Sequence, residues 1–469
     1  MRDRRSFSGW IVTHRIALLL GLVVLVGAVL RLIQANQAVS GDEVSTLWVV
    51  KGNSLGETID LVSSDAEITP PLNFILSWFA VQLGSAPELV RLPALLAGIA
   101  AIPLTWVLGR RTVGVSAGLI GATVMALSPF MIFFSGNGRA YTVMILLLLA
   151  STIVMLKADE SGRTRWWVAY GALSCLAMYS HYTAAFVLAA QLVWLLVARP
   201  RSRAPALLAN AGAAVLFLPW LSGLLSDLDS PTTKVLEALQ GDGFLAKRMA
   251  VEEWAFGHPF LAPSVMPGRA VTIAIALGLL VALLFTVRFL WKKWQSPERT
   301  RFPIPSGLAL ILMIGLAAPV GEALLALAGT DLFGARNLTA SWYGLALSIG
   351  AVLAIPGGMV TLLCSIVVLG GYGTAVAKLN TSANALPDFK GPAAVIDEQS
   401  RTGDVVVDMF AAIATPVTLT PLGAHASTDN PTYNLNLPRT PPPFLPNSST
   451  VIDPPEQEVN EAFERAKGH

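Results

Sequence analysis

The chain has 469 residues, of which 54% are hydrophobic and 13% are charged, and its formal net charge is +2 at pH 7. A soluble chain carries about 25% charged residues, so this composition excludes an ordinary soluble protein. Apolar runs of roughly 17–25 residues, the length of a membrane-spanning helix, recur over the first three quarters of the sequence. They predict an α-helical polytopic membrane protein.

The first apolar run extends from Ile16 to Leu32 and follows a basic N-terminus, MRDRRSFSGWIVTHR. The run is long, and no cleavage site of small residues is evident, so we interpret it as a retained first span rather than a signal peptide. The acidic pair Asp42 and Glu43 comes directly after it. In an arbitrary protein such a pair is an ordinary solvated loop end.

A shorter apolar stretch, PPLNFILSWFAVQLG, follows. It has about 15 residues, too few to cross a bilayer comfortably. If it crossed, Arg110 and Arg111 would lie outside and every later basic cluster would be inverted. We therefore predict a helix that lies in the outer membrane interface and starts at the paired prolines.

Basic clusters in the short loops set the orientation of the later spans. They comprise the N-terminus, Arg110-Arg111, Lys157 with Arg163 and Arg165, Arg199 with Arg201 and Arg203, and the group Arg288, Lys292, Lys293, Arg299 and Arg301. If all face the cytoplasm, about eleven spans result, with the N-terminus inside and the C-terminus outside. Residues 1–378 then form the membrane domain, with a first outer loop over 35–90 and a large outer loop over 225–269.

The composition changes near Lys378, and residues 379–469 are interpreted as a small extracytoplasmic α/β appendage. It reads as an amphipathic helix, a strand from Val405 to Val407, and a proline-rich segment before a short helix. The two cysteines, Cys175 and Cys364, lie within apolar runs and are expected to be buried packing thiols.

With this topology the unusual polar residues gather on the outer side. A single arginine at a helix end usually snorkels to the interface, but polar groups at membrane mouths are costly unless paired. Their coincidence on one face therefore indicates a site. The candidates are Asp42, Glu43, Thr69, Pro70, Asn73, Arg91, Asn137, Arg139, Tyr141, His181, Tyr182, Glu252, Glu253, His258 and Arg336.

Two long stretches carry a family resemblance: DAEITPPLNFILSWFAVQLGSAPELVRLPALLAGIAAIPLTWVLGRR and LSPFMIFFSGNGRAYTVMILLLLAS. They resemble the polyprenyl-phosphate-sugar glycosyltransferases of the GT-C fold, in the bacterial branch related to protein O-mannosyltransferases. The family has an acidic residue in the first outer loop, His-Pro-Pro-Leu, Glu-x-x-x-Arg-Leu-Pro and a later Arg-x-Tyr. Here these correspond to Asp42-Glu43, Thr69 to Leu72, Glu88 to Pro93, and Arg139 to Tyr141.

The resemblance implies a GT-C fold and transfer of a monosaccharide from a polyprenyl-phosphate donor, with inversion, to a glycan, lipid or protein of the cell envelope. It places the protein in the bacterial cytoplasmic membrane, with the reaction at the outer face. Two departures stand out: Thr69 replaces the frequent histidine, and the turn Gly136-Asn137-Gly138 lacks the acidic residue that often precedes Arg-x-Tyr.

The chemistry of such a transfer assigns roles to the candidates. A carboxylate must take the proton of the acceptor hydroxyl, and cations must stabilise the departing phosphate. Asp42 lies where a lipid headgroup would, so it is the expected base, with Glu43 holding the acceptor, coordinating a metal or orienting Asp42. Arg139 and Arg336, and more weakly Arg91, are the expected phosphate ligands. The remaining candidates are expected to contact the substrates.

No metal is expected, because no histidine or carboxylate pair has the spacing of a helical metal motif such as His-Glu-x-x-His. No other cofactor and no nucleic-acid partner are expected. Two alternatives to the enzyme remain open. A transporter or flippase would show broken helices, inverted repeats and charged residues near the membrane centre. A non-catalytic sugar-lipid-binding protein of the envelope would accommodate the two motif departures.

Overall fold

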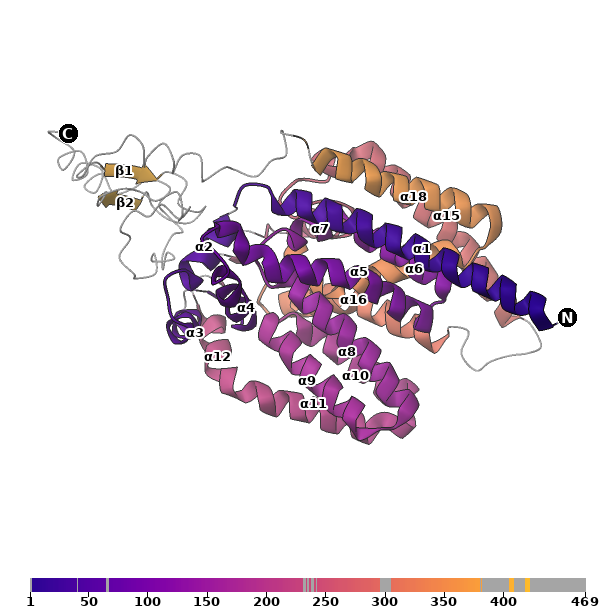
Figure 1. Cartoon of the computed structure of the whole chain (residues 1–469), viewed down its shortest axis with the longest axis horizontal. Coiled ribbons are helices and arrows are strands. Elements are labelled where there is room, and N and C mark those ends of the chain that lie inside the picture. Colours follow the sequence, from indigo (N-terminus) through magenta and orange to yellow (C-terminus); the bar gives the residue numbers. More distant parts are fainter. Residues whose placement is uncertain are drawn as a thin grey trace.

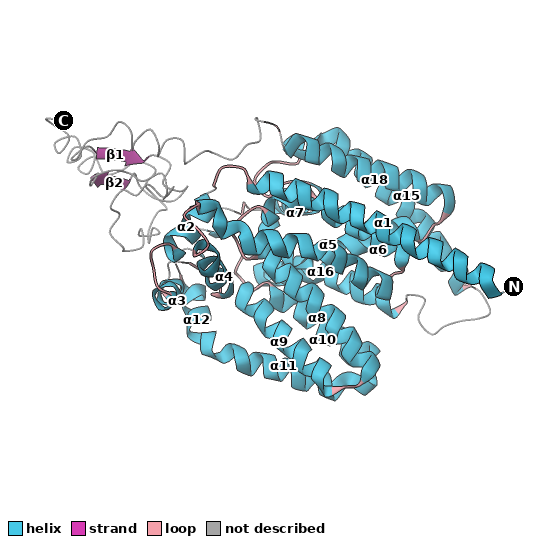
Figure 2. Cartoon of the chain, in the orientation of Figure 1, coloured by secondary structure: helices cyan, strands magenta, loops and turns pink. Residues whose placement is uncertain are grey.

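The computed structural model describes residues 2–39, 41–64, 67–230, 233, 236–237, 240–241, 243–295, 305–379, 381, 405–408 and 418–421. Almost all of this is helical (Figure 2). The long helices run side by side as one bundle (Figure 1), and they are α1 (Arg2–Ala35), α5 (Leu92–Thr112), α8 (Tyr141–Ser161), α9 (Thr164–Ser180), α10 (Ala184–Ala198), α11 (Arg203–Phe217), α15 (Arg269–Trp294), α16 (Ser306–Leu327), α17 (Trp342–Ala354) and α18 (Gly358–Leu379).

Eight helices in the described part of the chain are long and apolar enough to cross a membrane, and a bent pair makes a ninth. That pair is α6 (Val115–Leu127) and α7 (Pro129–Ser135), which meet at 61°. The shorter α9 lies against α8 and α11, and the shorter α10 lies against α16. The described residues thus contain eight or nine helices that could span a membrane, where the hydropathy and charge pattern predicts about eleven, and the chain is a multi-pass membrane protein.

A buried arginine holds the bend between α6 and α7. Pro129 has no N–H, so the carbonyl of Met125 loses the helical bond that residue 129 would donate. The Arg31 guanidinium, fully buried on α1, donates to the carbonyls of Met125 (2.9 Å) and Ala126 (3.2 Å). Its Nε also donates to the hydroxyl of Ser135 at 3.0 Å. Arg31 thus replaces backbone partners that the bend removes and fixes where α7 ends.

Short helices cover one end of the bundle, which we call the α2–α4 end (Figure 1). They are α2 (Gly41–Val50), α3 (Leu55–Ser63), α4 (Leu72–Val81), η1 (Pro87–Arg91), η3 (Leu218–Trp220) and α12 (Leu221–Asp229). The predicted interfacial helix is α4. Its ten residues would span about 15 Å, half of a bilayer core, and it packs on α2, α3 and η1 instead.

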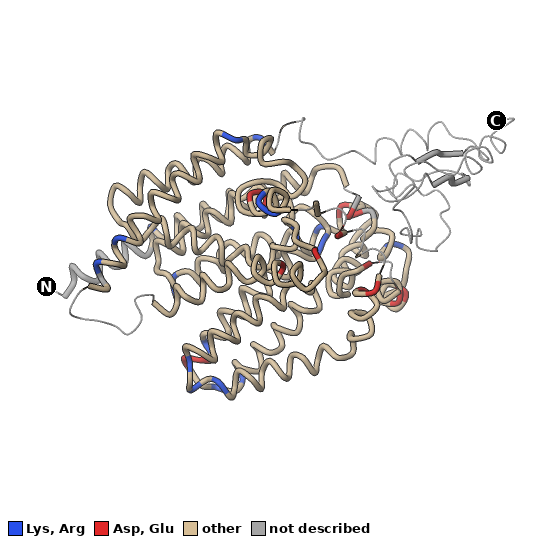
Figure 3. The backbone as a smooth tube through the Cα atoms, turned by 180° about the vertical axis from the view of Figure 1, so that it is seen from behind, with Lys and Arg blue, Asp and Glu red and all other residues tan. Residues whose placement is uncertain are grey.

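The predicted basic clusters around Arg111 and Arg199 lie together at the opposite end, whereas Arg299 and Arg301 lie outside the described residues. Arg111 at the end of α5 pairs with Glu160 of α8 at 2.7 Å, and Arg199 pairs with Asp159 at 2.9 Å. In Figure 3, a cluster of basic residues lies at the end of the bundle away from the C-terminal strands, while acidic residues gather mainly at the end nearer to them. The grouping of the basic loops on one side matches the paired spans that the charge pattern predicts.

The remaining elements complete the described chain. They are η2 (Pro200–Ser202), α14 (Gly243–Phe256), η4 (Ser264–Gly268), η5 (Ala335–Ser341), β1 (Val405–Asp408) and β2 (Thr418–Pro421). The two strands pair antiparallel, with Val405 opposite Pro421, and β1 contains the predicted strand. The rest of the predicted appendage lies outside the described residues. Both cysteines are free and buried, as expected.

Candidate functional site

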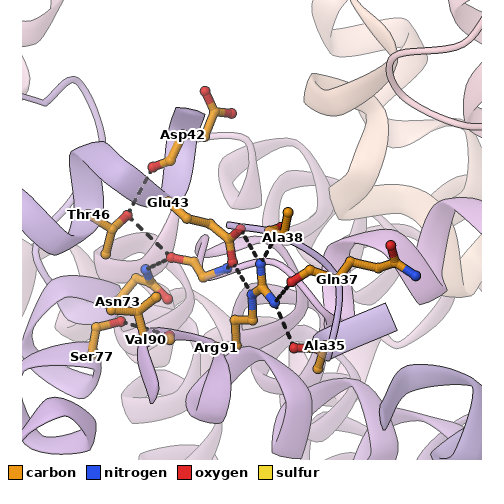
Figure 4. A network of polar contacts seen from close by, with 11 residues as sticks. Ala35, Gln37, Ala38, Asp42, Glu43, Thr46, Asn73, Ser77, Val90 and Arg91 are labelled. Carbon is orange, nitrogen blue, oxygen red and sulfur yellow. Dashed lines mark hydrogen bonds and ion pairs between the residues drawn. The ribbon is translucent and has the colours of Figure 1, made fainter. Parts of the chain in front are cut away.

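The two carboxylates that follow the first span lie on the first turn of α2, where the helix dipole favours negative charge. They point in different directions, because successive residues on a helix are about 100° apart. Glu43 points into the protein and is fully buried, whereas the Asp42 side chain is exposed. Figure 4 shows the Asp42 carboxylate directed away from the network around Glu43.

Glu43 forms a buried, two-pronged ion pair with Arg91. Arg91 Nε lies 2.6 Å from Glu43 Oε1, and Nη2 lies 2.8 Å from Oε2. The other three N–H groups of Arg91 donate to the carbonyls of Ala35, Gln37 and Ala38 at 2.6–2.8 Å. A guanidinium has five donors, so none remains for a phosphate. The geometry therefore favours a structural role for Arg91, in place of the phosphate ligand that the sequence suggests.

The same ion pair fixes the turn before α8. Gly138 donates its N–H to Glu43 Oε1 at 2.9 Å, and its carbonyl accepts from Asn73 Nδ2 at 3.2 Å (Figure 4). A Cβ at residue 138 would lie 2.8 Å from Val90, so the turn needs glycine to approach this closely. Glu43 and Asn73 thus hold the backbone on which the adjacent Arg139 stands.

Arg139 is held by an acidic residue that sequence reasoning missed. Its Nη1 and Nη2 each lie 3.0 Å from one oxygen of Glu67, in a bidentate pair. Ser45 also donates to Glu67, and Arg139 Nη1 donates to the backbone carbonyl of Asp42 at 3.4 Å. Burial alone would lower the pKa of Arg139, but Glu67 and then Asp42 raise it overall. Arg139 is therefore a permanent cation beside Asp42.

The signal for Glu67 was present in the sequence DAEITPPL. Glu67 stands two residues before Thr69, at the start of the segment that carries the Pro-Pro motif. Its carboxyl is nearly buried, with 6% of the side chain exposed. A buried acidic residue close to the membrane surface is costly unless a cation pairs with it. Arg139, already a candidate site residue, is a cation that could form this pair.

His181 and Tyr141 lie beside Arg139, with their rings 5.2 Å apart. Burial, then the charges of Arg139 and Arg336, lower the pKa of His181 to about 3. The imidazole is therefore neutral near pH 7, and its Nδ1 contacts the hydroxyl and N–H of Thr183. Both arginines act on the same imidazole, so Arg139 and Arg336 both lie within electrostatic range of His181 although they are far apart in the sequence.

Arg336 stands near the start of η5 and is partly exposed. No hydrogen bond or ion pair to a described residue engages its guanidinium, in contrast to Arg91 and Arg139. The Asp42 carboxylate likewise has no hydrogen-bonding partner among the described residues. Tyr141 is within electrostatic range of both Arg336 and Asp42. Within the described part of the chain, the site thus combines a carboxylate and a guanidinium without side-chain partners, at Asp42 and Arg336, with the guanidinium of Arg139 that pairs with Glu67.

Three predicted site residues make their contacts elsewhere. Tyr182 donates to Asp227 of α12, Glu252 pairs with Arg248 on α14 at 3.3 Å, and His258 packs against the ring of Phe133 at 4.6 Å. Burial lowers the pKa of His258 to about 3, so it is also neutral near pH 7.

Of the other predicted contacts, Asn73 reaches the turn before Arg139 through its bond to Gly138, and Asn137 belongs to that turn. Pro70, Asn73 and Asn137 are buried, and Thr69 is partly exposed, in the segment that follows Glu67. In the described part of the chain no group of three or more histidine, cysteine, aspartate or glutamate side chains has the arrangement of a metal site.

Comparison with known proteins finds the resemblance seen in the sequence. Residues 69–222 match the family model described as dolichyl-phosphate-mannose-protein mannosyltransferase. The Bacillus subtilis (strain 168) protein YycA, provisionally assigned as a mannosyltransferase, is 31% identical over 156 residues. That match covers 33% of this chain and 22% of YycA.

The fold is similar to that of an archaeal oligosaccharyltransferase. The Archaeoglobus fulgidus AglB complex with an inhibitory peptide and a dolichol-phosphate superposes with a TM-score of 0.52 at 14% identity. The same enzyme in its apo form gives 0.53 at 11% identity. These matches cover 83% and 84% of this chain but only 59% of the archaeal chain. The likeness confirms the GT-C fold that the sequence resemblance predicted.

Proposed function

We propose that this protein is a membrane glycosyltransferase that transfers a monosaccharide, with inversion, from a polyprenyl-phosphate donor to an acceptor of the cell envelope. The observation that carries this proposal is the unpaired Asp42 carboxylate beside Arg139 and Arg336, at one end of a GT-C membrane bundle. The expected location is a bacterial cytoplasmic membrane, with the α2–α4 end outward and the N-terminus in the cytoplasm. The basic loops at the opposite end support this orientation.

The residues divide the reaction between them. Asp42 takes the proton as the acceptor oxygen attacks the anomeric carbon of the sugar. The bond from that carbon to the phosphate oxygen breaks, and polyprenyl phosphate departs with the bonding electrons. Arg336, whose guanidinium has no hydrogen-bonding partner among the described residues, stabilises the negative charge that develops on this phosphate. Arg139 adds positive charge beside Asp42, while Glu67 keeps its guanidinium in place.

The test is sugar transfer in membranes from a panel of radiolabelled polyprenyl-phosphate sugars. Asp42→Asn should lower turnover by about 10²–10⁴-fold, the usual value of a general base, without loss of protein or of donor binding. The matched control is Asp60→Asn, which removes an exposed carboxylate of α3 at the same end of the bundle. Full turnover by Asp42→Asn would contradict the assignment of the base.

The same assay separates the two alternatives. A flippase would move labelled lipid between leaflets without forming a glycosylated product. A sugar-lipid-binding protein would retain labelled donor without turnover by the wild type, and the departures at Thr69 and Asn137 would then explain the loss. Either result would overturn the proposed enzyme.

A further inference from the structure

The end of the bundle opposite the α2–α4 end carries positive charge that the site described above does not use. Two acidic residues near the end of α8, Asp159 and Glu160, are each paired with an arginine from another segment, at 2.9 Å and 2.7 Å. Several exposed basic residues of the same turns form no ion pair with a described residue: Arg110, Lys157, Arg163, Arg165, Arg201 and Arg203. This end therefore presents cations that the described acidic residues do not neutralise.

Two of these cations lie on one aromatic ring at the turn between α8 and α9. The Nζ of Lys157 is 4.1 Å from the centroid of the Trp166 ring, and the Cζ of Arg165 is 5.2 Å from it. Lys157 and Arg165 are exposed, whereas Trp166 is half-buried. The face of an indole attracts cations, but two cations that share a ring repel each other. An anion in contact with both of them would offset this repulsion.

The other tryptophans at this end carry one cation each. Arg199 lies 4.7 Å from the centroid of the Trp194 ring and is already paired with Asp159, and Arg110 lies 4.8 Å from that of Trp106. The orientation of the spans accounts for basic residues at this end of the bundle. It does not account for two cations that are gathered on one ring without a described acidic partner.

An exposed apolar stripe of α9 begins beside this pair of cations. Val168, Ala172 and Leu176 follow Arg165 at spacings of three and four residues, so they share its face of the helix. Val168 is 65% exposed and Leu176 is 40% exposed. Because α9 packs along α8 and α11, which belong to segments long and apolar enough to span a membrane, this stripe lies at the depth of the lipid tails.

We propose that Lys157, Arg165 and Trp166 bind the phosphate group of an anionic phospholipid whose acyl chains lie along the exposed stripe of α9. Basic residues next to the membrane attract anionic headgroups. A phospholipid brings one phosphate to both cations and covers the apolar stripe, whereas a free phosphate does only the first. The site lies at the opposite end of the bundle from Asp42, so this lipid belongs to the other leaflet, and the inference does not depend on the proposed function.

The experiment measures lipid binding to the purified full-length protein by native mass spectrometry, with phosphatidylglycerol and phosphatidylcholine as probes. Lys157→Gln with Arg165→Gln should weaken phosphatidylglycerol binding at least about tenfold, because each cation near an anionic headgroup contributes about fivefold. Binding of the zwitterionic phosphatidylcholine should change less than about twofold, since its net charge is zero. Lys157→Arg with Arg165→Lys keeps both charges and should retain most of the affinity for phosphatidylglycerol.

Arg201→Gln with Arg203→Gln is the matched control. It removes the same charge from the same end of the bundle, and neither arginine lies on an aromatic ring of a described residue. A bound lipid also raises the thermal unfolding midpoint, so phosphatidylglycerol should raise it in wild type and in this control but much less in Lys157→Gln with Arg165→Gln.

Three results would overturn the site. Equal losses of phosphatidylglycerol affinity in the two double variants would show attraction to a basic surface as a whole. Unchanged affinity in Lys157→Gln with Arg165→Gln would show that these cations do not bind the lipid. A rise of the unfolding midpoint with inorganic phosphate as large as that with phosphatidylglycerol, at equal concentration, would exclude a phospholipid as the specific occupant.

Discussion

At the scale of single residues, the charges of the α2–α4 end divide into those that build the site and those left for a ligand. Glu43 and Arg91 satisfy each other and join four segments: the linker after α1, the start of α2, η1 and the turn at Gly138. Asp42 stands one position away and has none of these bonds. Adjacent acidic residues thus have opposite roles because a helix directs them to different surroundings.

The first prediction concerns the buried pair. Glu43→Gln leaves Arg91 charged and buried, so we expect the free energy of unfolding to fall by about 3–5 kcal/mol. Asp42→Asn should change it by about 0.5 kcal/mol or less, because that side chain is exposed. Urea unfolding in detergent, followed by tryptophan fluorescence, measures both. Equal stability of the two variants would contradict the division of roles, and Glu43→Gln with Arg91→Met should recover part of the loss.

Pairing explains why sequence reasoning assigned these residues imperfectly. Asp42 and Arg336 were singled out by residue type and by position at span ends, and the structure leaves both without protein partners. Arg91 is, like Arg336, an arginine at the end of a span. Its partner Glu43 is 48 positions away in the sequence, so no local sequence pattern predicts their contact. Glu67 was missed although its local setting carried a signal, because its importance lies in its pairing with Arg139, 72 positions away.

At the scale of elements, α14 carries a carboxyl whose charge responds to pH. Burial, and then the charge of Glu252, raise the pKa of Glu253 from 4.5 to about 7. Between these values the folded protein binds more protons at this site than the unfolded chain. The contribution of Glu253 to stability therefore decreases as pH rises from about 4.5 to about 7, and it is constant above that range.

The second prediction is that Glu253→Gln removes this slope. The thermal unfolding midpoint, measured from pH 4.5 to 8, should decline less with rising pH in Glu253→Gln than in wild type. Glu252→Gln is the control, and it should keep most of the slope because burial is the larger cause. Parallel curves for wild type and Glu253→Gln would rule out a buried, titrating Glu253.

Element types were largely predictable, whereas bends and short helices were not. Apolar length identified the spans, and the Pro-Pro pair located the start of α4 correctly. The bend at Pro129 depends on Arg31, which lies about a hundred positions earlier in the sequence. An arginine near the end of the first span looks like a snorkelling residue, so its role in the bend became visible only in the packed bundle.

At the scale of the whole molecule, the segment that carries Arg336 is tied to a distant part of the chain. Lys247 of α14 pairs with Asp331 at 2.6 Å, and Glu237 accepts the backbone N–H of Asp331 at 3.0 Å. The Asp331 carboxylate also accepts the N–H of Phe333. These bonds anchor the loop immediately before η5. We therefore regard Lys247 as a positioning residue for Arg336.

The third prediction tests that coupling. Lys247→Gln should raise the KM for the lipid donor by up to about fivefold, the effect of a partly exposed ion pair, and leave kcat nearly unchanged. Lys247→Arg should restore the KM because it keeps the charge. Arg248→Gln, one position along α14, removes the neighbouring pair with Glu252 and should leave the KM unchanged. A KM in Lys247→Gln equal to wild type would show that the anchor does not reach Arg336.

The sequence by itself determined that this is a multi-pass helical membrane protein. The hydropathy of a span depends only on its own residues and does not change with the way in which the helices pack. It also indicated the resemblance to the GT-C enzymes, through motifs a few residues long. Only the tertiary structure decided which charges are neutralised within the protein and which are left for a ligand. Glu43 with Arg91 and Glu67 with Arg139 are contacts between distant segments, and these contacts leave Asp42 and Arg336 without side-chain partners among the described residues.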